Sequence, residues 1–132
     1  MTYRDVIKVA TKQDGFYDLT KQISDIVGKS KIRDGLCNAF LKGTTAALLI
    51  NENDRMLIED IKKTAKQLIP DEHIYQHPDN APSHLRAALL GQQLTIPVAD
   101  AQLTLGTWQS VLLFELDNRD REREIIVTVN GA

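Results

Sequence analysis

The sequence is short of cysteine, and this shortage excludes one class of protein at once. Cys37 is the only cysteine among 132 residues. A single cysteine cannot form a disulfide within the chain, which excludes a disulfide-stabilised scaffold and fits a protein of the reducing cytoplasm. The neighbours of Cys37 are typical of a strand core, where cysteine packs as a small hydrophobic side chain, so we expect no reactive thiol.

The sequence also lacks a charge bias and a long apolar run. It has 18 acidic and 16 basic residues, without a run of lysine and arginine that could follow a nucleic-acid backbone. No segment approaches the roughly 20 apolar residues of a membrane-spanning helix, and no apolar stretch follows Arg4 and Asp5. We therefore expect a soluble, cytoplasmic protein that binds neither nucleic acid nor membrane.

Hydropathy periodicity predicts one domain, residues 1–132, built from strands and helices. The predicted strands are 2–10, 35–40, 46–50, 94–98, 102–105, 107–116 and 124–130. The predicted helices are 16–27, a long helix between the polar cluster 51–54 and Pro70, and a short helix from Ser83 to Gly91. Helices are confined to the first two-thirds of the chain, and the linkers 99–101 and 117–121 have the length of hairpin turns. This order predicts an α+β fold with a largely antiparallel sheet.

The segment 75–86 is the most suggestive of chemistry, because it places His77 and His84 in a loop that leads into a helix. Two prolines stiffen the loop. With Ser83 as the expected N-cap, His84 lies in the first helical turn, close to exposed N–H groups, the positive end of the helix dipole and Arg86. This arrangement predicts binding of an anion such as phosphate. Alternatively, both histidines are ordinary loop and cap residues, since six intervening residues are not a zinc signature.

In the strand predicted from Thr107, the sequence does not decide whether two residues are buried or exposed. Glu115 shares a face with Gln109 and ends an apolar row, so it is either a solvated rim residue or a buried group with a partner. Trp108 is expected in the core, because a lone tryptophan in a strand usually packs, although it could instead stack on a ligand. Residues 111–113 and 125–127 are apolar on both faces, which favours a homo-oligomer.

Short motifs with a characteristic order run along almost the whole chain. They are Gly15-Phe16-Tyr17-Asp18-Leu19-Thr20, Thr44-Thr45-Ala46-Ala47-Leu48, Asn51-Glu52-Asn53, Tyr75-x-His77, Asp79-Asn80, Ser83-His84-Leu85, Leu89-Leu90-Gly91, Pro97, and Leu105-Gly106-Thr107-Trp108-Gln109 with Glu115. In these motifs the chain resembles the YjbQ-like family, described as secondary thiamine-phosphate synthases. The resemblance implies an α+β subunit with sandwich-like antiparallel sheets, two longer helices and one short helix. It also implies a homotrimer or higher homo-oligomer, with the active site near a subunit boundary.

The resemblance further implies a set of site residues. His77 and His84 match the histidines of the family's loop motif and would bind a divalent metal, zinc or magnesium. Glu52 and Asn53 match its acidic and amide positions. The implied catalytic residues are Glu52, His77, His84 and Arg86, and the implied ligand-binding residues are Thr44, Thr45, Asn53, Asn80, Trp108 and Gln109. Gly43 stands where many members have histidine, so the usual positions do not supply a three-histidine site.

Three functions are compatible with these residues. The first is a thiamine-phosphate-synthase-like transferase that joins a pyrimidine pyrophosphate to a thiazole phosphate and releases pyrophosphate, with Arg86, a divalent ion and the helix N-terminus stabilising the leaving group. Imidazoles favour zinc-like ions, however, whereas magnesium prefers oxygen ligands. The second is a metal-dependent hydrolase that uses zinc-bound water. The third is an oligomer that binds a phosphorylated metabolite without turnover.

Overall fold

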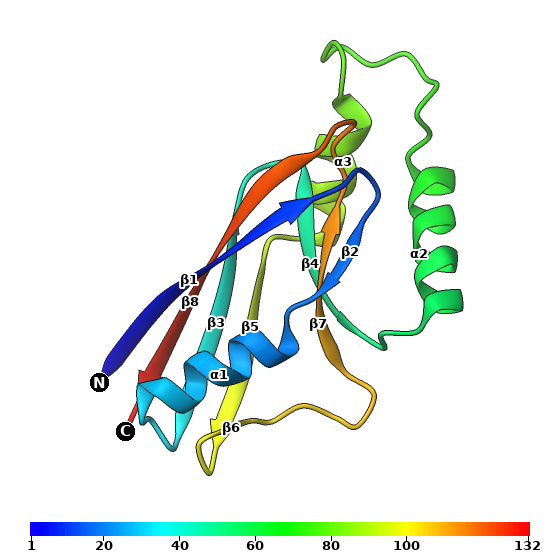
Figure 1. Cartoon of the computed structure of the whole chain (residues 1–132). Helices are drawn as coiled ribbons and strands as arrows, with labels where there is room; N and C mark the ends of the chain where they lie inside the picture. The colour runs from blue at the N-terminus through cyan, green and yellow to red at the C-terminus, as the bar shows by residue number, and fades with distance from the viewer.

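A computed structural model describes all 132 residues, with eight strands and three helices (Figure 1). The elements are β1 (Thr2–Thr11), β2 (Phe16–Asp18), α1 (Thr20–Ser30), β3 (Gly35–Lys42), β4 (Ala46–Asn51), α2 (Arg55–Leu68), α3 (Ala81–Leu90), β5 (Gln93–Ala99), β6 (Gln102–Leu103), β7 (Ser110–Glu115) and β8 (Arg121–Gly131). The strands form a five-stranded sheet in the order β1-β8-β3-β5-β6 and a three-stranded sheet in the order β2-β7-β4. Every pairing is antiparallel, which confirms the predicted α+β fold.

The main core lies between the five-stranded sheet on one side and α1 with the three-stranded sheet on the other. Alternation along β8 places Ile125, Val127 and Val129 on the buried face, and α1 contributes Ile23 and Val27 at helical spacing. In Figure 1, α1 crosses in front of the lower part of the five-stranded sheet. One face of the five-stranded sheet is thus buried, as the alternation of apolar and polar residues along its strands predicts.

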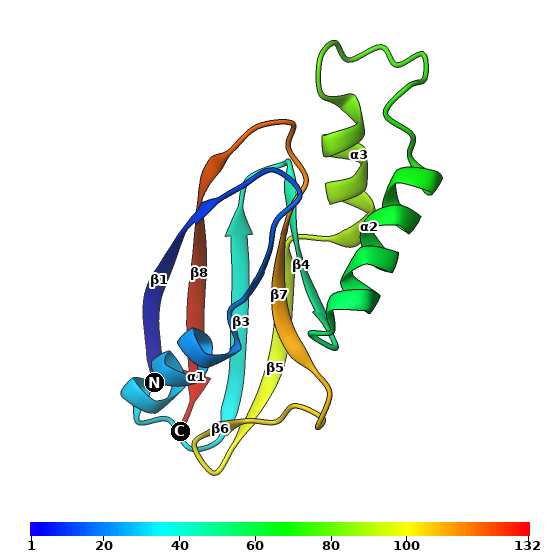
Figure 2. The same cartoon turned by 45° about the vertical axis from the view of Figure 1, so that its right-hand side comes forward.

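A second, smaller core covers the opposite face of the three-stranded sheet. It joins Ala47 and Phe114 from the sheet to Ala65 of α2 and Ala87 of α3. Figure 2 shows α2 and α3 side by side, away from β1 and β8. Because β7 is covered on both faces, residues 111–113 are buried within one chain, and their apolar character does not by itself require an oligomer.

The predicted start of the first helix is wrong. Phe16 lies in β2 instead, where it pairs with Phe114 of β7 and its ring centroid is 4.2 Å from the Phe114 ring. The Asp18 carboxylate accepts hydrogen bonds from the N–H and hydroxyl of Thr20, and the helix begins there. The apolar spacing of this segment fits a helix, but pairing with β7 and the aromatic contact decide its first residues. The helix also continues past Gly28 to Ser30.

The strand predicted from Thr107 begins later, at Ser110, because residues 106–109 form a turn. The Gln109 N–H donates to the Gly106 carbonyl at 3.1 Å, and the Gly106 N–H donates to Gln109 Oε1 at 2.8 Å. Trp108 lies on this turn with 72% of its surface exposed, so its predicted core position is wrong. The linker 117–121 is not a hairpin either, since it connects β7 of one sheet to β8 of the other.

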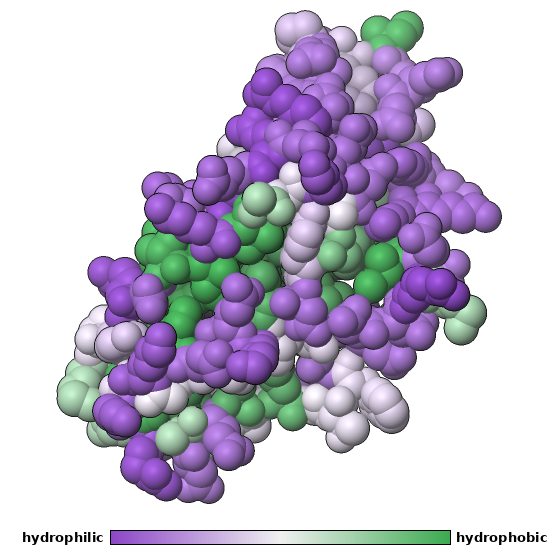
Figure 3. Space-filling view, viewed as in Figure 1, coloured by the Kyte–Doolittle hydropathy of each residue, from purple (hydrophilic) through white to green (hydrophobic).

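Cys37 is buried in β3, and burial raises the pKa of its thiol to about 11. This confirms that the only thiol is unreactive at neutral pH. None of the three helices combines the length and the apolar composition needed to cross a membrane. Figure 3 shows that hydrophobic side chains nevertheless remain visible in the middle of one face, above α1 and surrounded by hydrophilic ones.

Candidate functional site

The predicted histidine loop follows α2 and folds against the start of α3. His77 is exposed and His84 is half-buried. Their ring centroids lie 4.9 Å apart with an interplanar angle of 78°, and His77 Nε2 lies 3.2 Å from Asn80 Oδ1. Beside this loop is a polar hollow of about 250 Å³, lined by Gln13, Asp71, Asp79, Asn80, Pro82, Ser83 and Asn118. The structure therefore brings the two predicted histidines together beside a polar surface.

The start of α3 differs from the prediction. The N-cap is Asn80, so Ser83 lies inside the first turn and is buried. Pro82 favours this earlier start, because proline suits the first helical positions. Pro82 also offers no N–H, and the N–H groups of Ser83 and His84 both point to the Asn80 carbonyl, at 3.1 and 3.4 Å. Few backbone N–H groups are thus left for an anion, and the two imidazoles are the main donors at this helix end.

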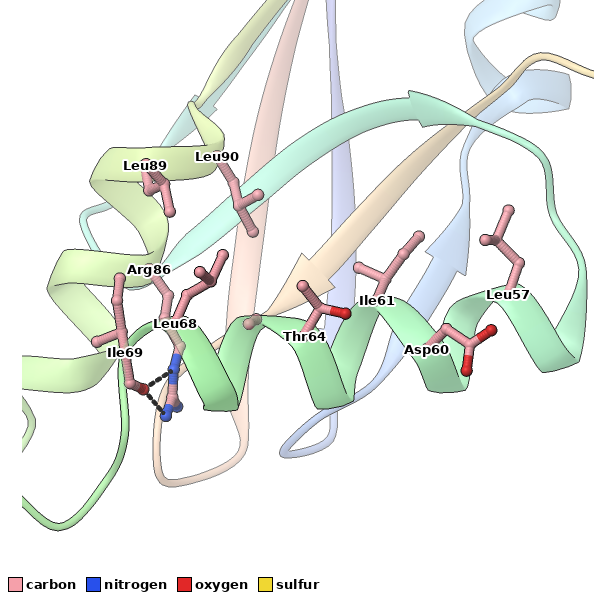
Figure 4. Close-up of a pocket in the computed structure, with 10 residues that line it drawn as sticks. Leu57, Asp60, Ile61, Thr64, Leu68, Ile69, Arg86, Leu89 and Leu90 are labelled. Atoms are coloured by element: carbon pink, nitrogen blue, oxygen red, sulfur yellow. Dashed lines mark hydrogen bonds between the residues drawn. The ribbon is translucent and has the colours of Figure 1, made fainter.

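Arg86 is buried and holds the base of the loop (Figure 4). Its Nε and Nη2 donate to the carbonyl of Ile69, the residue that follows α2, and Nη2 also donates to Asp71 Oδ1 at 2.9 Å. Arg86 borders an apolar groove of about 230 Å³ between α2 and α3. These bonds position the loop, and a direct role of Arg86 on a leaving group stays a prediction.

A buried ion pair lies behind the loop, at the end of the main core. Arg123 Nη2 is 2.6 Å from Glu115 Oε2, and Arg123 Nε is 2.7 Å from Glu115 Oε1. The hydroxyl of Thr11 donates to Glu115 Oε1 at 2.6 Å, and Arg123 Nη2 also donates to Thr45 Oγ1 at 2.8 Å. Both charged side chains are nearly inaccessible to water. Glu115 is therefore the buried, partnered group of the two alternatives, and no buried side-chain polar atom lacks a hydrogen bond.

Asp117 connects this ion pair to the histidine loop. Its carboxylate accepts from Thr45 Oγ1 at 3.1 Å, from Asn80 Nδ2 at 3.2 Å, from the Asn118 N–H at 2.8 Å and from Arg121 at 3.2 Å. Burial acts to raise the pKa of Asp117, but the hydrogen bonds from Asn80, Asn118 and Thr45 and the charge of Arg121 outweigh it and lower the pKa. Asp117 is consequently ionised at neutral pH.

Sequence reasoning missed Asp117 and Arg123 as members of this centre. One signal was available for Arg123, since strand alternation places it on the same face as Ile125 and Val127. A charged residue on a buried face needs a partner. We name the whole region the histidine end: His77, Asn80, His84, Thr45 and Asp117, with the Glu115–Arg123 pair behind them.

The histidine end does not complete a metal site within one chain. Nowhere do three His, Cys, Asp or Glu side chains come together in a geometry that could hold a metal ion. Gly43, where the resemblance led us to look for a third histidine, has φ +138°, and a Cβ there would lie 2.9 Å from Arg123 Nη1. A third imidazole at this position would have to displace the buried guanidinium. The predicted zinc or magnesium ion stays a prediction, and it would need ligands beyond the two histidines.

The other predicted site residues lie at the opposite end of β4 and β7. We name this region the tryptophan end: Glu52, Asn53, Trp108 and Gln109. Asn51, which ends β4, pairs with Ser110, which begins β7. Six residues of β7 separate this end from the histidine end, about 20 Å at 3.4 Å per residue. One chain therefore brings together His77, His84, Asn80 and Thr45, with Thr44 next to them, but not Glu52 or Trp108.

Side chains at the tryptophan end have few partners. Asn53 Nδ2 donates to Asp18 Oδ2 at 3.1 Å, whereas the Glu52 carboxylate makes no hydrogen bond or ion pair. The N-cap of α2 is Asp54, whose carboxylate accepts from the Leu57 N–H at 2.9 Å. Asp54 therefore caps this helix, and the Glu52 carboxylate does not take part in capping.

Comparison with known proteins identifies the family. A family model described as UPF0047 protein YjbQ-like matches residues 5–132. The chain belongs to this family. A UPF0047 protein of Methanothermobacter thermautotrophicus is 42% identical over 117 residues, covering 86% of this chain and 81% of that protein. The YjbQ protein of Salmonella typhimurium is 35% identical over an alignment of 137 residues that covers 99% of both chains.

Solved structures of the UPF0047 family have the same fold. A protein of Sulfolobus solfataricus, described as YbjQ-like and of unknown function, is 38% identical with a TM-score of 0.96 and covers 100% of this chain and 99% of its own. An uncharacterized conserved protein of Clostridium acetobutylicum is 30% identical with a TM-score of 0.90, and the match covers 96% of this chain and 99% of that one. Both are described without an activity, so family membership assigns a fold and leaves the reaction open.

Proposed function

We propose that this chain is a transferase of the thiamine-phosphate-synthase type. The reaction joins the methylene carbon of a pyrimidine pyrophosphate to the ring nitrogen of a thiazole phosphate. The carbon–oxygen bond to pyrophosphate breaks, its electron pair leaves with pyrophosphate, and the thiazole nitrogen supplies the pair for the new carbon–nitrogen bond. Such a reaction needs stabilisation of the leaving negative charge more than it needs a nucleophilic side chain.

The observation that carries the proposal is the His77–His84 pair, whose ring centroids are 4.9 Å apart at the start of α3. Two neighbouring imidazoles can donate hydrogen bonds to a pyrophosphate, and one can transfer a proton to it as it leaves. The positive end of α3 adds to the attraction for anions. Carboxylates line the adjoining hollow, so the histidines are the groups at this end that favour a phosphate.

The proposal includes a homotrimer or higher oligomer with a site shared between chains. Trp108 is exposed and offers a flat surface on which a pyrimidine could stack, but it lies at the tryptophan end, about 20 Å from the histidine end by the length of β7. A head-to-tail contact, which closes into a ring, would join the histidine end of one chain to the tryptophan end of the next. The apolar area visible on one face in Figure 3 is the kind of surface that such a contact covers.

The test is release of pyrophosphate by the purified, untagged protein supplied with both substrates and either magnesium or zinc. We expect a product that contains both rings, and we expect His77→Ala and His84→Ala to lower the rate at least tenfold. His73→Ala is the matched control, because His73 is an exposed histidine of the same loop whose ring meets that of Tyr75 edge to face. Phosphate release from a single substrate would support the hydrolase alternative, and binding without any release would support a non-catalytic binder.

The shared site has its own test in mixed oligomers. His77→Ala and Glu52→Gln chains, each of which we expect to have a lowered rate alone, are unfolded together and refolded. If the site lies between chains, some contacts in the mixture join the intact histidine end of a Glu52→Gln chain to the intact tryptophan end of a His77→Ala chain. Part of the wild-type activity should then return. Activity that does not return, although mass spectrometry shows mixed oligomers, would place the whole site in one chain.

A further inference from the structure

A chain of hydrogen bonds leads from the buried ion pair out to His77. Arg123 donates to Thr45 Oγ1 at 2.8 Å, the Thr45 hydroxyl donates to Asp117 Oδ2 at 3.1 Å, and Asn80 Nδ2 donates to Asp117 Oδ1 at 3.2 Å. The other end of the Asn80 amide, Oδ1, lies 3.2 Å from His77 Nε2. An exposed imidazole is thereby connected to a centre that no solvent reaches.

The chemistry of the groups fixes the direction of each bond. A carboxylate without a proton can only accept, and Asp117 is ionised because its hydrogen-bond donors lower its pKa. The NH₂ group of Asn80 must therefore face Asp117, and its carbonyl oxygen must face His77. A carbonyl oxygen can only accept, so the proton of this last bond belongs to His77 Nε2.

We infer that Asp117 is a positioning residue which, through Asn80, holds His77 in the Nε2–H tautomer and leaves the Nδ1 electron pair free to bind a metal ion, or to take up a proton that it then donates to a phosphorylated ligand. The same arrangement orients the ring, as a hydrogen-bonded second partner does for many histidine ligands. The inference rests on the proposed role of His77 and specifies which of its two nitrogens performs that role.

Asn80 permits a clean test because its side chain makes no capping bond to α3. Removing it breaks the connection without removing a cap. Asn80→Ala takes away both the acceptor for His77 and the donor to Asp117. Asp79→Asn is the matched control, because Asp79 is exposed on the same loop and its side chain accepts a hydrogen bond from Asn118, at 3.4 Å, and none from His77 or Asp117.

The experiment is ¹⁵N nuclear magnetic resonance of the histidine side chains, at about pH 8.5, two units above the pKa of a free imidazole. Long-range correlations between ring protons and nitrogens identify which nitrogen carries the proton. In the wild type we expect His77 to be protonated at Nε2 alone, and in Asn80→Ala we expect both tautomers. Asp117→Ala should also give both tautomers of His77, because the side-chain amide of Asn80 can then rotate and present either its oxygen or its NH₂ group to the ring. Asp79→Asn should keep the wild-type pattern.

Addition of inorganic pyrophosphate then shows which ring nitrogen of His77 contacts the ligand. We expect the resonance of His77 Nδ1 to move while Nε2 keeps its proton. A wild-type protein with the proton on Nδ1, or an Asn80→Ala spectrum identical to wild type, would overturn the inference. Far-ultraviolet circular dichroism checks that each variant is folded. Since the tautomer is read in the absence of turnover, a protein with the expected spectra but no transferase activity would contradict the proposed function alone.

Discussion

The two ends of the three-stranded sheet differ in how their polar side chains are held. At the histidine end, Thr45, Glu115 and Asp117 are buried, and each makes at least two hydrogen bonds. At the tryptophan end, Trp108 is 72% exposed and the Glu52 carboxylate has no partner. A site must be rigid where it orients reacting groups and open where a ligand enters. In the function proposed above, the histidine end would orient the reacting groups, and the tryptophan end would be completed by a ligand or by another chain.

The largest effect is expected from breaking the buried pair. Glu115→Gln keeps the shape of the side chain but leaves the Arg123 guanidinium buried without a counter-charge. We expect the free energy of unfolding to fall by about 3–5 kcal/mol, measured by urea denaturation. Trp108→Ala at the other end should change it by no more than about 0.5 kcal/mol. Similar losses from the two variants would remove the contrast between the ends.

A smaller loss is expected from a side chain at Gly43. Its φ of +138° is unfavourable for any residue with a Cβ, and Arg123 lies in the way. Gly43→Ala should cost about 1–3 kcal/mol. The control is Gly28→Ala within α1, where a Cβ meets nothing within 4 Å and the change should stabilise the protein by about 0.5–1 kcal/mol. A neutral Gly43→Ala would mean that Arg123 and the turn adapt easily.

Glu52 and Asp54 separate binding from capping at the tryptophan end. If Glu52 holds a divalent metal in the shared site, Glu52→Gln removes a charged ligand, and we expect it to weaken metal binding at least tenfold, about 1.4 kcal/mol, in titration calorimetry, with an unchanged melting temperature. Asp54→Ala should do the reverse, because it removes the bond to the Leu57 N–H: stability falls by about 1 kcal/mol and binding is unchanged. Lower stability of Glu52→Gln with intact affinity would contradict its place in the site.

The effect expected from Cys37 is absent at neutral pH and appears only at alkaline pH. Its pKa is about 11 in the folded chain and near the ordinary 9.0 when unfolded, so between these values the folded protein retains a proton that the unfolded chain releases. Stability from this group is complete below about pH 9 and decreases as the pH rises to about 11. Cys37→Ala should show a shallower decrease over this range in urea denaturation, and equal slopes would contradict the assignment.

Periodicity predicted the long strands well, because the two faces of β1, β3 and β8 meet different environments. It failed where a distant strand partner or a local side-chain turn decides the structure. Phe16 joins a strand because Phe114 lies opposite, and Trp108 is exposed because Gln109 closes a turn. Within the histidine end, the loop motif indicated His77 and His84. The bond from Asn80 to Asp117 spans 37 residues, and local sequence contains no sign of it.

The ion pair between Glu115 and Arg123 also bears on how β8 finds its place. In the observed pairing, Arg123 lies opposite Val9 of β1, and Ile125 lies opposite Leu41 of β3. A slip of β8 by one residue would turn Arg123 outward and bring Glu122 or Glu124 inward towards Glu115. Two carboxylates would then meet in a dry interior without a cation. The pair thus makes the neighbouring registers far less stable than the native one, and the longest strand of the molecule can pair in only one way.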